Sequence, residues 1–216
     1  TFEIDNRVAT RALLEMCKRL ERTWALDDIL NAMAPAIHDV LGYRHAWLTL
    51  FGHPPGFVNV ISHVDAENPQ DTKKRNVMSI DIPIAEDAML EELMTANHVV
   101  VVEDARTDPR TNKAIVAQLQ NRTIINVPLV LADERLGAIG MGTFGDAEGV
   151  RPPLDWHLEF LQTVAGHVAV ALDRVRFMAA RKQAEEALQQ TLDLTNNVIQ
   201  SMQDGFLMVD TQGILV

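Results

Sequence analysis

The sequence has one cysteine, fewer basic than acidic residues, and no long hydrophobic run. Cys17 cannot form a disulfide within the chain or build a cysteine-based metal site. A single cysteine fits a reducing compartment, so we expect a cytoplasmic protein. The 19 Lys and Arg residues face 30 Asp and Glu residues, which gives a formal net charge of −11. This charge argues against nucleic acid or an anionic membrane surface as the main partner.

Nothing in the sequence is long and apolar enough to cross a bilayer. The longest nearly apolar run, residues 163–172, contains His167 and falls far short of the roughly 20 residues that a spanning helix needs. We therefore expect no direct membrane contact. Hydrophobic residues make up 47% and charged residues 23% of the 216 positions, as in ordinary globular chains. Because the sequence begins without Met and stops inside an apolar run, we expect a segment of a longer protein.

The apolar spacing of the first hundred residues predicts two helices followed by strands. The first helix reaches about Trp24, and the second begins at the N-cap candidate Asp27 and ends at Gly42, with Pro35 as an anomaly inside it. Residues 65–76 are polar and are expected to form a loop. The other expected elements are strands at 46–51, 57–64, 80–84 and 99–102 and a short helix at 86–96.

The second half of the chain is expected to hold one more helix, a hairpin and a long terminal helix. Asp108 followed by Pro109 favours a helix start, because a carboxylate caps the helix and Pro loses no bond at its first position. The remaining elements are strands at 123–131 and 136–144 around a turn at 132–135, and a helix from about Leu154 to at least Met202. This order predicts an α+β fold with a mostly antiparallel sheet, with the terminal helices on one face.

Apolar residues at alternating spacings of three and four predict helix pairing. We expect a parallel homodimer through the first helix and the start of the long one. The expected interface residues are Leu13, Cys17, Leu20, Leu161, Val164, Val168, Ala171, Val175 and Met178. The repeat fails near Lys182 and Glu185 and resumes as Leu188, Thr191, Thr195, Val198 and Met202. Such a phase break marks a stutter or a join between two modules.

Several segments, taken in order, resemble a GAF domain. Residues 97–110 combine a helix end, an apolar strand, an Asp and a short loop to Asp-Pro-Arg. The likeness continues through residues 125–129 and 135–140 and ends in the helix at 160–172. It covers roughly residues 10–178. The resemblance implies a central antiparallel sheet with helices packed on it and a long C-terminal signalling helix.

The residues that follow resemble the parts that join sensor modules in bacterial signalling proteins. Residues 181–188 are similar to a helical connector, and 199–214 to the opening of a PAS domain with a turn at 210–213. The implied division is a GAF sensory domain at 1–180, a helical linker at 181–203 and a truncated PAS start at 204–216. That order implies a bacterial multidomain sensor, either a histidine kinase or a cyclic-dinucleotide signalling protein.

The run from Gly140 to Gly145 matches the pattern G-x-G-x-x-G. A dinucleotide fingerprint needs a parallel strand before the pattern and a helix directly after it. Here the strand follows a hairpin turn, and a proline-containing loop comes next. We therefore interpret these glycines as small residues in a strand packed under a helix.

The seven histidines show no metal-binding spacing, and we expect no metal site. His63 and His98 flank loops that would close over the sheet, where a histidine holds a haem iron in a few GAF sensors. We favour packing or surface roles for both. His157 and His167 lack the acidic residue and turn that follow the phospho-acceptor histidine of kinases. The sequence names no cofactor.

Six residues are candidate ligand contacts. Arg106 is a candidate for binding a carboxylate or phosphate bidentately. Asn112 stands where some cyclic-nucleotide GAF domains carry a related Asn, although the rest of their constellation is missing and a solvated helix face is the simpler interpretation. The other candidates are His63, Trp47, Thr123 and Asn126. The three strand candidates depend on strand phase, because a slip of one residue turns each side chain away.

The resemblance implies a sensory domain that binds a small ligand and relays its state through a dimeric helix to a downstream PAS or output domain, such as a histidine kinase. We expect no catalysis in this segment. A ligand-free dimerisation spacer is one alternative. A GAF-type redox enzyme is another, which the single Cys17 disfavours. The identity of the ligand stays open.

Overall fold

The computed structural model describes residues 2–52, 54–65 and 80–206, and side chains within 6–200 except at 53, 62, 63 and 66–80. The chain forms two units that divide between Val175 and Arg176. Its elements are α1 (Phe2–Leu20), α2 (Leu26–Leu41), β1 (His45–Phe51), β2 (Phe57–Asp65), β3 (Ile80–Pro83), α4 (Ala88–Thr95), β4 (Val100–Val102), α5 (Lys113–Leu119), β5 (Asn121–Leu131), β6 (Glu134–Phe144), α6 (Gly145–Glu148) and α7 (Asp155–Phe206).

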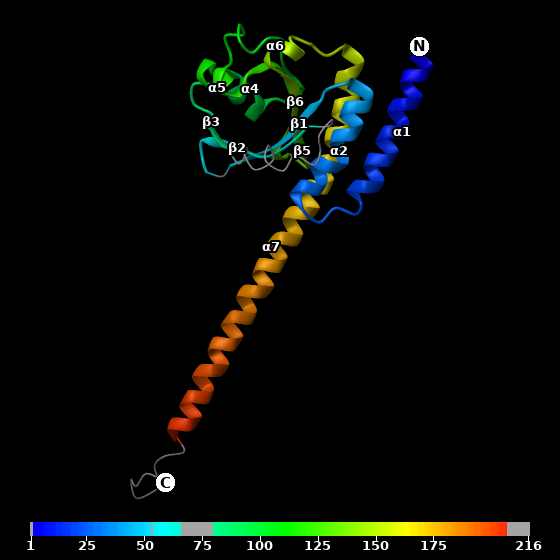
Figure 1. Ribbon diagram of the computed structural model, residues 1–216. Helices are drawn as coiled ribbons and strands as arrows, with labels where there is room; N and C mark the ends of the chain where they lie inside the picture. Colours follow the sequence, from blue (N-terminus) through cyan, green and yellow to red (C-terminus); the bar gives the residue numbers. More distant parts are fainter. Residues whose placement is uncertain (1, 53, 66–79, 207–216) are drawn as a thin grey trace, which may run out of the picture. The chain divides into compact units, whose positions relative to one another are not determined.

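The first unit is built on a six-stranded antiparallel sheet in the order β3-β2-β1-β6-β5-β4. The helices α1 and α2 and the first part of α7 cover one face, and α4 and α5 lie on the other (Figure 1). Because both faces are covered, the central strands are buried along most of their length. The α+β fold with an antiparallel sheet is confirmed, and the terminal helices do share one face.

The second helix begins and ends through local chemistry. It starts at Leu26, because the carboxylate of Asp28, rather than that of Asp27, accepts the N–H groups of Trp24 and Ala25 at 3.3 and 3.2 Å. It ends as expected at Gly42, whose φ of 71° places it in the left-handed region and whose N–H donates to His38 O. Pro35 lies inside the continuous helix.

The expected helix at Asp108 begins four residues later. The Asp108 carboxylate accepts the Arg110 N–H at 2.9 Å and forms a turn instead of a helix cap. The N-cap is Asn112, whose Oδ1 accepts the N–H groups of Ala114 and Ile115 at 3.0 and 3.3 Å. The pattern correctly indicated that a polar side chain caps a helix in this segment, but the cap is Asn112 and not Asp108.

The chain's own core, and not a second copy, covers most of the apolar stripe of α7 that we expected at a dimer interface. Leu161, Val164, Val168, Ala171 and Val175 are all buried in the core of the first unit. Leu20 is buried in the same core, and Leu13 and Cys17 pack against it. An apolar repeat shows that a helix face is covered, but a second copy and the chain's own sheet satisfy it equally well. Only Met178, which is 38% exposed, belongs to the second unit.

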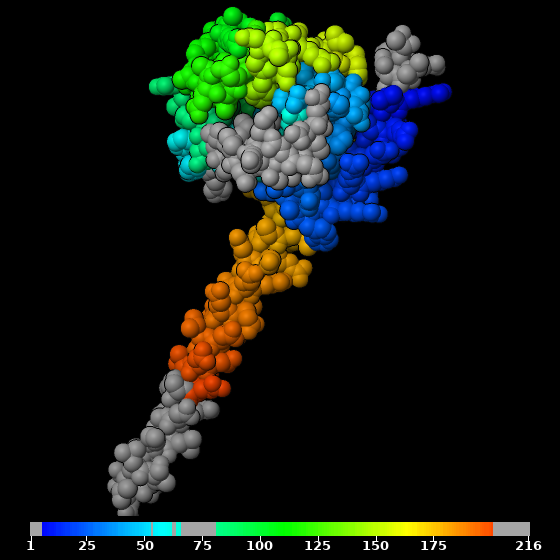
Figure 2. Space-filling view, in the orientation of Figure 1, coloured from blue at the N-terminus to red at the C-terminus, as the bar shows by residue number. Residues whose placement is uncertain are grey.

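In the second unit, α7 continues from Arg176 to Phe206. Every side chain described from 177 to 200 is exposed, and Figure 2 shows this segment in gold to orange-red. Residues 199–206, expected to open a PAS domain, are helical. The expected turn at 210–213 lies outside the described residues. None of the described helices has the length and apolar character needed to span a membrane.

The glycines of β6 make room for an indole ring. Gly140 pairs with Trp47 of β1 on one side and with Asn126 of β5 on the other. A Cβ atom added to Gly140 would overlap the Trp47 indole, and one added to Gly142 would overlap the carbonyl oxygen of Thr123. The G-x-G-x-x-G run therefore serves close packing within the sheet, against an indole rather than the helix that we expected.

We predict that Gly140→Ala destabilises the first unit, because the new methyl group must displace the buried Trp47 ring. The expected loss is about 1–3 kcal/mol in the free energy of unfolding, measured by urea denaturation. The matched control is Gly166→Ala in α7, where a Cβ would have no neighbour within 4 Å. This control should stabilise the chain by up to about 1 kcal/mol through helix propensity. Equal effects of the two substitutions would contradict the packing role of Gly140.

Candidate functional site

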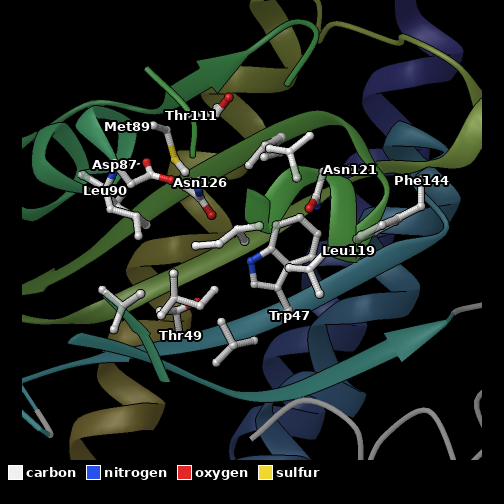
Figure 3. Close-up of a pocket in the computed structure, with 17 residues that line it drawn as sticks. Trp47, Thr49, Asp87, Met89, Leu90, Thr111, Leu119, Asn121, Asn126 and Phe144 are labelled. Atoms are coloured by element: carbon white, nitrogen blue, oxygen red, sulfur yellow. Dashed lines mark hydrogen bonds between the residues drawn. The ribbon is translucent and has the colours of Figure 1, made fainter. Parts of the chain in front are cut away.

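A cavity of about 70 Å³ lies between the sheet and the two helices α4 and α5 (Figure 3). That volume is several times the roughly 10–15 Å³ that one water needs. Strands β1, β2, β3, β5 and β6 contribute to the floor. The lining residues are Trp47, Thr49, Val58, Val60, Ile82, Asp87, Met89, Leu90, Leu93, Thr111, Ile115, Val116, Leu119, Asn121, Ile124, Asn126 and Phe144.

The helices α4 and α5 form the roof of the cavity, and the buried carboxylate of Asp87 joins them. Asp87 Oδ1 accepts the Leu90 N–H and caps α4, and Asp87 Oδ2 accepts the Asn112 N–H where α5 begins, each at 3.0 Å. The Met89 N–H adds a bond to the carbonyl oxygen of Arg110 at 3.0 Å. The roof is therefore a single hydrogen-bonded assembly of α4, α5 and the segment between them.

Four neutral polar residues of the floor are more than nine-tenths buried. Trp47, Thr49, Asn121 and Asn126 are exposed by 7, 4, 6 and 4%. Within the described part of the chain, their side chains make one hydrogen bond, from Asn126 Nδ2 to Met89 Sδ at 3.2 Å. Figure 3 shows the Trp47 indole nitrogen and the Asn126 oxygen directed into the space between the lining residues. The polar atoms of these four side chains are not sealed from the cavity, so water or a ligand there can form hydrogen bonds with them.

Two of the six candidate ligand contacts are brought together here. Trp47 and Asn126 both line the cavity, and their strands flank Gly140, which has no side chain to separate them. The backbone of His63 pairs with Trp47 across β1 and β2, but its side chain lies outside the described residues. Asn112 is the N-cap of α5 and touches the site only through its N–H bond to Asp87.

Thr123 is directed away from the cavity. Its hydroxyl donates to Glu103 O and accepts the Arg151 N–H, each at 2.8 Å. Alternation along a strand places residues an odd number apart on opposite faces, so Thr123 and Asn126 do not share one. The bulge between Asn121 and Ile124 adds a further local irregularity.

Arg106 also lies outside the cavity, in a surface ion cluster. Its guanidinium donates to Asp146 at 2.6 Å, and this hydrogen bond is the main cause of the lowered pKa of the Asp146 carboxyl. Arg122 bridges Asp146 and Asp104 at 2.9 and 3.2 Å. The guanidinium that we expected to bind an anionic ligand is therefore already paired with carboxylates of the chain.

The cavity contains residues that the sequence analysis missed. Thr49 lies two positions after Trp47 on β1, so strand alternation alone predicts a shared face. Asp87 and Met89 belong to no recognisable sequence motif. They line the cavity because α4 lies over the sheet. Among the described residues, no group of three or more His, Cys, Asp or Glu side chains could hold a metal ion.

The only thiol is not activated. Cys17 packs in α1 against the helical core, away from the cavity lining. Burial, with a smaller contribution from Glu21, raises the pKa of the thiol. A nucleophilic or redox-active cysteine needs a lowered pKa and an electropositive setting. These observations weigh against a redox enzyme centred on Cys17.

Arg110 links the segment between α4 and α5 to α4 and to β4. Its guanidinium bonds Asp108 at 2.7 Å, Glu92 of α4 at 2.8 Å and the carbonyl oxygen of Val101 in β4 at 2.6 Å. The hydrogen bond from Arg110 is the main cause of the lowered pKa of the Asp108 carboxyl. The hydrogen bond to Asp108, with a smaller contribution from Glu92, in turn raises the pKa of Arg110. This cluster ties the roof to the edge of the sheet.

A family model described as GAF domain matches residues 25–173. None of the curated proteins compared with the chain shows significant sequence similarity. Solved structures with similar folds include the GAF domain of a phosphoenolpyruvate-protein phosphotransferase from Coxiella burnetii. That likeness has a TM-score of 0.61 at 12% identity and covers 80% of this chain and 96% of that one.

Two further solved structures show the same fold in other settings. The free methionine-R-sulfoxide reductase from Neisseria meningitidis has a TM-score of 0.59 at 14% identity, covering 79% of this chain and 91% of that one. The chromophore-binding domain of a bacteriophytochrome from R. palustris has a TM-score of 0.58 at 12% identity. It covers 79% of this chain and 62% of that one.

We predict that Arg110→Gln destabilises the first unit by about 1–2 kcal/mol at pH 7, because three acceptors lose their charged donor. The pKa of Asp108 is lowered in the fold, so its stabilisation is full above the ordinary pKa of about 3.9 and is lost as the pH falls through the lowered value. The difference between wild type and variant should therefore shrink below about pH 4. Urea unfolding between pH 2.5 and 7 measures it.

The control for this substitution is Arg11→Gln, which removes an exposed pair with Glu15 at 3.4 Å. Exposed pairs of this kind contribute roughly 0–1 kcal/mol. A loss for Arg110→Gln no larger than that of the control, or one that stays constant with pH, would contradict the role of the Arg110 cluster.

Proposed function

The chain belongs to the GAF domain family, and on that premise we propose that its first unit is a sensory domain that binds a small molecule under α4 and α5. The observation that carries this proposal is the set of four neutral polar side chains that face the cavity and are more than nine-tenths buried. A purely structural spacer would favour apolar residues at such positions, because they pack without needing partners.

The architecture offers a route from the cavity to α7. Adjacent residues of β1 point to opposite faces, so Trp47 belongs to the cluster on the cavity face and Leu48 to the helical core that includes α7. The roof is joined to the β5–β6 hairpin through Arg135, which donates to the carbonyl oxygens of Thr95 and Ala96 and to Asn97 Oδ1. A ligand that favours one position of the roof would shift the packing across the sheet.

Ligand binding is tested through the tryptophan indole N–H signals in a ¹H–¹⁵N NMR spectrum of the full chain. The probes are a set of one-ring neutral, anionic and cationic fragments. We expect at least one class to move the Trp47 signal in a saturable way, since that indole faces the cavity. The Trp24 signal is an internal control, because Trp24 is 69% exposed and lies outside the cavity lining.

A matched pair of variants tests whether binding occurs in this cavity. Val116→Phe adds bulk to the roof of the cavity and should weaken binding, whereas Val130→Phe adds the same bulk on β5 outside the lining. Both variants are first checked for cooperative thermal unfolding. If no fragment moves the Trp47 signal, or if both variants bind as wild type does, the sensory function proposed for this cavity is wrong. A ligand-free spacer would then be favoured.

We further propose that two copies pair through the exposed part of α7 and pass the signal to a downstream PAS or output domain, such as that of a histidine kinase. Phe177, Leu188 and Val198 are exposed by 69, 61 and 56%. With Ala184, Thr191 and Thr195 they fall on one stripe with spacings of three, four and seven residues. Most of the stability of helices in proteins comes from packing of an apolar face, so pairing would stabilise this exposed segment.

We predict that Leu188→Glu converts the dimer to a monomer, because it places a charge within the apolar stripe. Light scattering at micromolar concentration should give twice 24.1 kDa for the wild type and 24.1 kDa for the variant. Leu194→Glu is the control, since Leu194 is 67% exposed but lies off the stripe. A monomeric wild type, or equal effects of both substitutions, would overturn the pairing.

A further inference from the structure

We propose that the cavity under α4 and α5 selects a neutral one-ring molecule with a hydrogen-bond donor beside an acceptor, as in a lactam or cyclic amide, and that it discriminates against anions. This inference rests on the ligand-binding function proposed above and adds to it the chemical class of the ligand.

Among the described residues that line the cavity, no side chain offers a counter-charge to an anion. No lysine, arginine or histidine belongs to the described lining. Asp87 is the only charged residue there, and each of its carboxylate oxygens already accepts a backbone N–H. The nearby cations are engaged elsewhere, Arg106 with Asp146 and Lys113 with the Ala105 carbonyl oxygen. An anion buried here would lose hydration without gaining a counter-charge, which is costly.

The polar groups that face the cavity define a donor and an acceptor. The indole N–H of Trp47 only donates. The amide group of Asn126 is oriented by Met89, because a thioether sulfur only accepts and therefore binds the Asn126 NH₂. The Asn126 oxygen is thereby left to face the cavity as an acceptor (Figure 3). A ligand must offer an acceptor to Trp47 and a donor to Asn126.

The two groups are close in the fold because they occupy one row across three strands. Trp47 and Asn126 are both opposite Gly140, from β1 and β5 on its two sides. A compact ligand edge with C=O next to N–H therefore matches them better than two groups at opposite ends of a molecule. Thr49 and Asn121 add a hydroxyl and an amide, which both donate and accept. The remaining lining is mostly aliphatic, and its size suits a single ring.

The test compares three probes of nearly equal size with the full chain, followed through the Trp47 indole signal. 2-Pyridone offers adjacent N–H and C=O groups, N-methyl-2-pyridone lacks the donor, and benzoate is an anion of similar shape. We expect 2-pyridone to bind at least about tenfold more tightly than either of the other two, since each of them leaves a buried partner unsatisfied.

A variant separates the hydrogen bond from general packing. Asn126→Leu removes the acceptor with little change in volume and should weaken 2-pyridone binding at least about tenfold, while leaving N-methyl-2-pyridone unchanged. Arg106→Gln, outside the cavity, should leave both affinities unchanged. If Asn126→Leu does not fold cooperatively, the affinities of the three probes for the wild type still test the proposed ligand class.

Each failure has its own meaning. Benzoate that binds as tightly as 2-pyridone, or equal affinities of 2-pyridone and its N-methyl derivative, would overturn the neutral donor–acceptor class. The neutral donor–acceptor class would also be overturned if other fragments move the Trp47 signal and 2-pyridone does not. In that case the proposed sensory function would stand. A Trp47 signal that no fragment moves would overturn both proposals.

Discussion

The contact between the Trp47 indole and the bare backbone at Gly140 is the constraint from which the candidate site follows. A side chain at Gly140 would occupy the ring's position, and the indole would no longer lie beside Asn126 in the same row of strands. The absence of a Cβ in the centre of the sheet thus lets a large donor from β1 and a carboxamide from β5 meet over one glycine. The cavity is the space that remains when α4 and α5 close over that row.

The sheet separates two kinds of packing that share the same strands. On one face, long helices pack against the sheet in a core that is rich in Leu, Ile, Val, Met and Ala residues. On the other face, short helices lie over a floor that includes polar groups. Hydrogen bonds that Asp87 accepts and that Arg110 and Arg135 donate hold these helices in place. The helical face is suited to rigidity, and the face with the cavity is suited to changes of contact, as the proposed ligand-binding function needs.

Much of the fold was predictable from periodicity, because strands such as β5 and β6 and the stop at Gly42 follow from local chemistry. Trp47 and Asn126 were also placed correctly on the cavity face of the sheet. Thr123 was not, because strand alternation turns it to the face opposite Asn126. Arg106 and the α7 stripe were misassigned for a different reason. A guanidinium or an apolar stripe indicates that a partner is needed, but tertiary structure determines which partner. Arg106 found Asp146, forty residues away, and Leu161 found the chain's own core.

The double role of Asp87 has a consequence for local unfolding. The first turns of α4 and α5 are separated by more than twenty residues in sequence, yet one carboxylate satisfies an N–H group at each. Moving either helix away breaks the bond from the Asn112 N–H to Asp87 that joins them, so we expect the amide protons of both helices to become exchangeable in one event. The two helices would then form one cooperative unfolding unit, and each local unfolding event would expose the whole cavity at once.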